Sequence, residues 1–200
     1  MRQALTKSIM SLQARDIKGI GVASSARIRL GGLAAMVGGL LWIVKGGSIL
    51  ITGQQPPVVF EAALPLFAVG LLGLHARLEG RGGPLGKAVV LVAYAALAAA
   101  ILTLVAPLAP FIAVAGFGPF VGLVLVGSAT LQARIFPPPW SALPLAVGLG
   151  GPILILAGGD LALMGERLLE IPIVLVGLAW MLLGYSVLAV QGTTVQAPHA

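Results

Sequence analysis

The chain has 200 residues, of which 58% are hydrophobic and 9% are charged, whereas an ordinary soluble domain is roughly 45–50% apolar and about 25% charged. This composition excludes a water-soluble enzyme of normal make-up and predicts a protein that is packed in lipid. The formal net charge is +6 and there is no cysteine, so disulfides, thiol catalysis and thiolate metal sites are excluded.

Residues 1–28 form a basic arm that is expected to lie in the cytoplasm. Met1, Leu5, Ile9 and Leu12 recur at helical spacing among cationic residues, a pattern suited to an amphipathic helix that binds anionic cytoplasmic lipids. A disordered tail is the other interpretation of a terminus with so few anchoring side chains. The arm contains no aromatic residue, and nucleic-acid binding would require a basic face with interleaved aromatics, so no nucleic-acid partner is expected.

Six apolar segments follow the arm, and about 20 residues are enough for a helix to cross a bilayer. They are residues 30–51, 58–76, 87–106, 111–131, 141–159 and 171–190. The 46 residues between Lys87 and Arg134 contain no charged side chain, and Pro107 and Pro110 divide them into two spans because proline interrupts a helix. Backbone without internal hydrogen bonds cannot face lipid. We therefore predict an all-α integral membrane protein, a compact bundle of six transmembrane helices over residues 29–190.

The distribution of positive charge predicts the orientation of the bundle. Ten of the twelve basic residues lie in or directly next to the arm, the loop after the second span or the loop after the fourth. By the positive-inside rule both termini are cytoplasmic, including a short tail at 191–200. The short loops favour a multi-pass protein of the plasma membrane, here the bacterial inner membrane.

Small residues mark faces through which the spans are expected to pack, since helices associate in lipid through close backbone approach. These residues are Gly31, Ala35 and Gly39 in the first span, Ala95, Ala96, Ala99 and Ala100 in the third, and Gly118 and Gly122 in the fourth. The same glycine and alanine faces could bind a protein partner or a second copy of the chain. Similar stretches at 74–78 and 131–135 raise the possibility of three tandem helical hairpins, but a similar tetrapeptide in the arm shows that such stretches also recur without a repeat.

Lys45 and Glu61 are charges within the first and second spans. Each lies 16 residues from an arginine at the basic end of its span, Arg29 or Arg77, and therefore roughly 24 Å from that boundary at about 1.5 Å per residue. Because the two spans are antiparallel neighbours, we predict an intramembrane ion pair or ligand site at Lys45 and Glu61. The alternative is that each side chain snorkels separately to the outer surface.

Two further groups of residues raise the possibility of a binding site. Trp42 and Trp180 fall deep in their spans, and with Tyr94 and Tyr185 they could line an aromatic and polar pocket, with ordinary packing as the alternative. The loop between the fifth and sixth spans contains four charges, Asp160, Glu166, Arg167 and Glu170. A solvated outer loop is the favoured interpretation of these charges, and a carboxylate site for a hard cation is the alternative.

The sequence contains no arrangement of residues that indicates catalysis. His75 and His199 are its two histidines, and it has no phosphate-binding loop and no dinucleotide motif. We therefore predict no enzyme activity and no cofactor. The preferred hypothesis is a small-molecule binding or transport component of the membrane. The alternative is a non-catalytic scaffold or a partner subunit of a larger complex.

Overall fold

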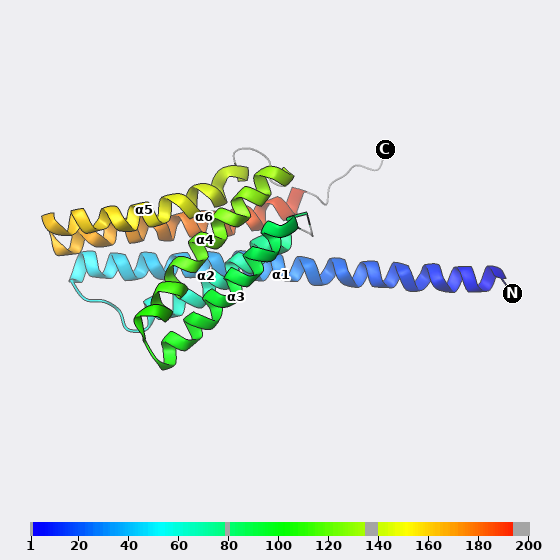
Figure 1. Ribbon diagram of the computed structural model, residues 1–200, viewed down its shortest axis with the longest axis horizontal. Coiled ribbons are helices and arrows are strands. Elements are labelled where there is room, and N and C mark those ends of the chain that lie inside the picture. Colours follow the sequence, from blue (N-terminus) through cyan, green and yellow to red (C-terminus); the bar gives the residue numbers. More distant parts are fainter. Residues whose placement is uncertain (1, 79–80, 135–139, 194–200) are drawn as a thin grey trace.

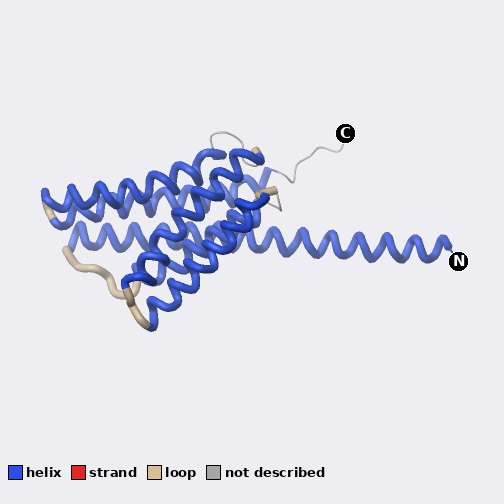
Figure 2. The backbone as a smooth tube through the Cα atoms, viewed as in Figure 1, coloured by secondary structure: helices blue, strands red, loops and turns tan. Residues whose placement is uncertain are grey.

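The chain folds as a bundle of six long helices (Figures 1 and 2). The computed structural model describes the backbone of residues 2–78, 81–134 and 140–193, and side chains from Ser25 onward except at 160, 162–164 and 190–193. The long helices are α1 (Arg2–Thr52), α2 (Val59–Arg77), α3 (Gly83–Val105), α4 (Ala109–Ala133), α5 (Leu143–Met164) and α6 (Glu170–Thr193). Short 3-10 helices, η1 (Trp140–Ala142) and η2 (Glu166–Leu169), precede α5 and α6.

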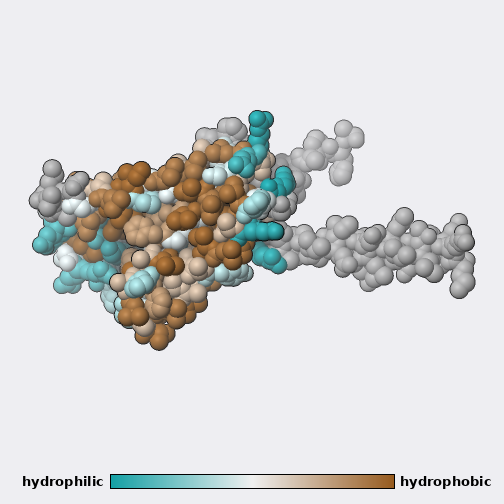
Figure 3. Space-filling view, viewed as in Figure 1, coloured by the Kyte–Doolittle hydropathy of each residue, from teal (hydrophilic) through white to brown (hydrophobic). Residues whose placement is uncertain are grey.

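Six helical segments are long and apolar enough to cross a membrane. They are Ser25–Thr52, Val59–Arg77, Gly83–Val105, Ala109–Ala133, Trp140–Gly159 and Glu166–Ala189. Each overlaps one of the six expected spans, which confirms the all-helical fold and the number of candidate spans. On the face shown in Figure 3, apolar side chains occupy the middle of the bundle and hydrophilic ones gather at its two ends. The side of the membrane on which the termini lie stays a prediction.

Prolines set the starts of three helices. Pro84, Pro110 and Pro144 lie in the first turns of α3, α4 and α5, where a missing N–H removes no intrahelical hydrogen bond. The expected division of the long uncharged segment is therefore confirmed, because α3 ends at Val105 and α4 begins at Ala109.

Helix α1 is much longer than the expected first span. It runs without interruption from Arg2 to Thr52, and its N-terminal part projects beyond the bundle (Figure 1). The backbone of the basic arm is thus helical from Arg2, and the structure describes the side chains of this helix only from Ser25 onward. Lipid binding by the arm stays a prediction, and residues 194–200 of the tail, with His199, lie outside the described residues.

Helices α1 and α6 pack against each other through matched rows of residues seven apart. Gly32, Gly39 and Gly46 on α1 face Gly184, Gly177 and Glu170 on α6. A methyl group on Gly177 would lie 2.6 Å from the carbonyl oxygen of Gly39, so the two backbones are in direct contact. The numbering rises on one helix and falls on the other, so the helices are antiparallel. A seven-residue repeat keeps one face of a helix against its neighbour over several turns.

A second row on α1 packs against α2. A Cβ on Gly73 would lie 2.5 Å from the Cα of Gly31, and a Cβ on Gly70 would lie 3.0 Å from the Cβ of Ala35. Elsewhere, Gly118 of α4 faces Ala96 of α3. The expectation that small-residue faces meet other helices is confirmed for these positions, and the helices they meet belong to the same chain.

Candidate functional site

A buried ion pair joins the first and last helices of the bundle. Lys45 Nζ, on α1, donates hydrogen bonds to both carboxylate oxygens of Glu170, at 3.0 Å to Oε1 and 2.9 Å to Oε2. The side chains of Lys45 and Glu170 are 9% and 7% exposed. This is the one salt bridge among the side chains that the structure describes. Two complementary charges are thus held inside a bundle in which the other fully buried side chains that the structure describes are uncharged.

The helix packing makes room for Glu170. It is the first residue of α6, where a negative side chain is stabilised by the N-terminal end of the helix dipole. It also occupies the third position of the α6 row, opposite Gly46. A Cβ on Gly46 would lie 3.6 Å from Glu170 Oε2 and 3.2 Å from its carbonyl oxygen. The missing side chain at Gly46 therefore leaves the space in which the carboxylate meets Lys45.

The predicted partner of Lys45 was Glu61, and the structure differs on this point. The Lys45 ammonium bonds to Glu170, whereas Glu61 is half-buried and its Oε2 atom has no hydrogen-bond partner. Equal depth in two neighbouring helices does not fix the rotation of each helix about its axis, and the close contact of α1 with α6 places a different carboxylate against Lys45. The seven-residue rows on α1 and α6 were the signal that could have identified Glu170.

Aromatic rings line the space beside the ion pair. Lys45 Nζ lies 5.7 Å from the centroid of the Phe60 ring, within the range of a cation–π interaction. Trp42, one turn before Lys45, stacks on Phe60 with ring centroids 6.1 Å apart. Glu61 directly follows Phe60 on α2. We call these contacting residues, Lys45, Glu170, Phe60 and Trp42, together with Glu61 as the chain neighbour of Phe60, the Lys45 cluster.

The two deep tryptophans meet through Phe67, which forms an edge contact with Trp42 at 5.1 Å and stacks on Trp180 at 4.5 Å. The tyrosines expected beside them are elsewhere, because Tyr94 is 57% exposed and Tyr185 54% exposed on the outer surface. Helices α3 and α6 are apolar around their whole circumference, so the sequence did not reveal which face turns outward. The predicted pocket of all four residues is not formed.

The indole nitrogens of Trp42 and Trp180 have no hydrogen-bond partner in the structure. Two buried hydroxyls, one on α3 and one on α6, bond within their own helices instead. Thr103 Oγ1 donates to the carbonyl of Ala100 at 2.7 Å, and Ser186 Oγ donates to Leu183 at 2.8 Å. Both indole nitrogens are therefore buried donors without partners, and that of Trp42 belongs to the Lys45 cluster.

The loop before α6 divides into solvated and buried charges. Glu166 and Arg167 are exposed, as expected for an outer loop, but Glu170 is buried. Glu166 and Glu170 do not form the alternative cation site, because both carboxylate oxygens of Glu170 already accept hydrogen bonds from Lys45. The side chain of Asp160 lies outside the described residues.

No protein-family model matches the chain, and no curated protein or solved structure is significantly similar to it. The class of the protein therefore follows from its own helices. Six apolar helices of spanning length are compatible with a multi-pass membrane protein. Any more specific role has to be argued from the buried charges.

Proposed function

We propose that the protein is a small-molecule binding or transport component of the plasma membrane, and that it binds its solute at the Lys45 cluster. The observation that carries this proposal is the buried ion pair of Lys45 and Glu170, together with a buried carboxylate oxygen of Glu61 on α2 that has no partner. Charged residues within membrane helices are rare and mark solute or ion pathways by default.

Stability alone gives a poor reason for keeping this ion pair. Removing two charges from water costs several kcal/mol per ion, and well-packed hydrophobic residues in their place are often as stable or more stable. The unpartnered oxygen of Glu61 and the unpartnered indole nitrogen of Trp42 add further unfavourable burial. A solute that bonds to these groups would offset part of the free-energy cost of burying them.

The charges of the Lys45 cluster favour a solute that carries an amino group. Lys45 contributes one positive charge, and Glu61 and Glu170 contribute one negative charge each, so the cluster is negative when both carboxylates are ionised. An ammonium group could bond to Glu61 and lie against an aromatic face such as that of Phe60. A primary amine or a zwitterion is therefore the expected class of solute.

A thermal-shift screen of the detergent-solubilised chain tests this function. Small amines and zwitterions are expected to raise the melting temperature of the wild type, because a ligand that binds only the native state stabilises it by about 2.7 kcal/mol at 100 times its Kd. The Glu61→Gln variant, which is nearly isosteric, should lose most of that shift. Equal shifts in both proteins, or no shift with any amine or zwitterion, would contradict the proposal.

The alternative function is that of a non-catalytic scaffold or partner subunit. Its expected contact faces are largely used within the chain, since Gly31, Gly39 and Gly118 pack against neighbouring helices. A scaffold would therefore have to bind through the remaining outer surface. Co-purification of a stoichiometric protein after mild detergent extraction, without stabilisation by solutes, would favour the scaffold.

A further inference from the structure

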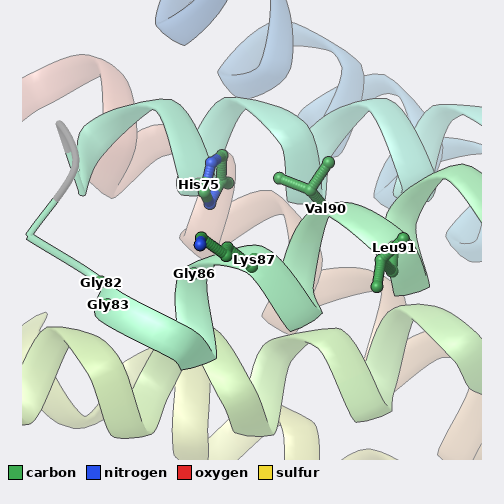
Figure 4. A pocket seen from close by; sticks show the side chains of 7 residues that line it. All are labelled: His75, Gly82, Gly83, Gly86, Lys87, Val90 and Leu91. Atoms are coloured by element: carbon green, nitrogen blue, oxygen red, sulfur yellow. The ribbon is translucent and has the colours of Figure 1, made fainter.

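A groove of about 470 Å³ lies at the other end of α2 from the Lys45 cluster. Its walls come from His75, near the end of α2, and from the start of α3 (Figure 4). The proposed solute site involves the start of α2, at Phe60 and Glu61, so the two sites are separate. Nothing in the proposed function uses this groove.

The mouth of the groove is rich in groups that bind anions. The His75 ring points from α2 toward the Lys87 side chain on α3 (Figure 4). His75 Nδ1 is buried and has no hydrogen-bond partner, and Lys87 is exposed and forms no salt bridge with any described carboxylate. Helix α3 also begins here, and the N-terminus of a 23-residue helix presents backbone N–H groups and a partial positive charge.

Glycines keep this mouth open. Gly82 and Gly83, which also line the groove, precede and begin α3, and a Cβ at Gly83 would meet no atom within 4 Å. A Cβ at Gly86 would lie 3.4 Å from His75 Cε1 and 3.8 Å from Nδ1. Any side chain at Gly86 would therefore occupy the space beside the His75 ring. The glycines allow a ligand to approach both the ring and the helix backbone.

The groove becomes apolar along α3. Val90 and Leu91 line it three and four residues beyond Lys87, a rise of about 4.5–6 Å along the helix axis. Leu91 is 72% exposed, so its side chain faces outward on a helix of spanning length. The groove thus has a cationic mouth next to an exposed apolar wall, which matches the chemistry of an amphiphile with an anionic head.

We propose that this groove binds a phosphate group, and that the phosphate belongs to the headgroup of an anionic lipid whose acyl chain lies along Val90 and Leu91. The phosphate oxygens accept hydrogen bonds from Lys87, from His75 and from the first turn of α3. The lipid thereby joins the end of α2 to the start of α3. This site is distinct from the basic arm, where the sequence also predicts contact with anionic lipid.

Native mass spectrometry of the full chain in detergent tests the site, with short-chain phosphatidylglycerol, phosphatidylcholine and inorganic phosphate as separate probes. Phosphatidylglycerol is expected to bind the wild type more tightly than phosphatidylcholine does. The Lys87→Gln variant should bind phosphatidylglycerol about tenfold more weakly, because it loses a hydrogen bond between charged groups. Arg134→Gln removes an exposed charge at the end of α4, outside the groove, and should leave the affinity unchanged.

A second variant tests the groove without removing a charge. Gly86→Leu keeps Lys87 but extends a side chain from a position in contact with His75, so phosphatidylglycerol binding should fall while the melting temperature of the lipid-free protein reports whether the fold survives. If that fold is lost, Lys87→Gln decides alone, because its side chain is exposed. Binding of inorganic phosphate that is as tight as that of phosphatidylglycerol, and equally weakened by Lys87→Gln, would overturn the lipid as the source. Equal affinity of Lys87→Gln and Arg134→Gln for phosphatidylglycerol would overturn the site itself.

Discussion

Replacing Lys45 by methionine is expected to lower the free energy of unfolding by about 3–5 kcal/mol, because the Glu170 carboxylate would stay buried without its cation. Replacing Glu170 by leucine should cost a similar amount, since the Lys45 ammonium would then be unpaired. Reversible unfolding of the detergent-solubilised protein, followed by circular dichroism, measures both losses.

The double variant Lys45→Met/Glu170→Leu separates a lost ion pair from general damage. Replacing both charges by apolar side chains leaves no buried charge, so stability should return to within about 1 kcal/mol of the wild type or exceed it. Losses that simply add in the double variant would show that the two residues do not interact. Adding Glu61→Gln should leave the cost of Lys45→Met unchanged, because Lys45 bonds to Glu170 and not to Glu61.

The second large effect is expected at the contact of α1 with α6. A methyl group at Gly39 would overlap the carbonyl oxygen of Gly177 and lie 2.9 Å from the backbone nitrogen of Met181. Backbone atoms cannot move aside as a flexible side chain can, so Gly39→Ala should destabilise the protein by about 1–3 kcal/mol. Thermal melting of the detergent-solubilised protein measures this loss.

Gly47→Ala is the matched control for that substitution. It makes the same chemical change in the same helix, but a Cβ at Gly47 would meet no atom within 4 Å. Alanine also favours the helical conformation by roughly 0.5–1 kcal/mol over glycine, so Gly47→Ala should be neutral or slightly stabilising. Equal destabilisation by Gly39→Ala and Gly47→Ala would contradict the close approach of α1 and α6.

The six helices could be predicted from the sequence because their signals are local. Each candidate span is an apolar segment of sufficient length, and Pro107 and Pro110 lie in or near the break between α3 and α4. The partner of Lys45 could not be predicted in this way, because it is determined by a contact between helices that are far apart in the sequence. The first and last helices of the chain are neighbours, and that contact exists only once the bundle is closed.

The sequence also did not show which way individual side chains point from their helices. Tyr94 and Tyr185 lie on helices that are apolar on every side, so no periodic pattern shows that they turn outward. The phosphate groove joins His75 to a glycine-rich helix start at 82–87. The sequence did not indicate that His75 lines this groove, because the groove forms only where the end of α2 meets the start of α3.

Labelling of single cysteines from outside intact cells tests most directly whether the chain crosses the membrane six times. The sequence has no cysteine, so Gln54→Cys, Glu166→Cys and Arg81→Cys each place one thiol at an exposed position. A membrane-impermeant maleimide is expected to label Gln54→Cys and Glu166→Cys, and to label Arg81→Cys only after the cells are opened. Labelling of Arg81→Cys and Gln54→Cys from the same side would contradict the six-span bundle.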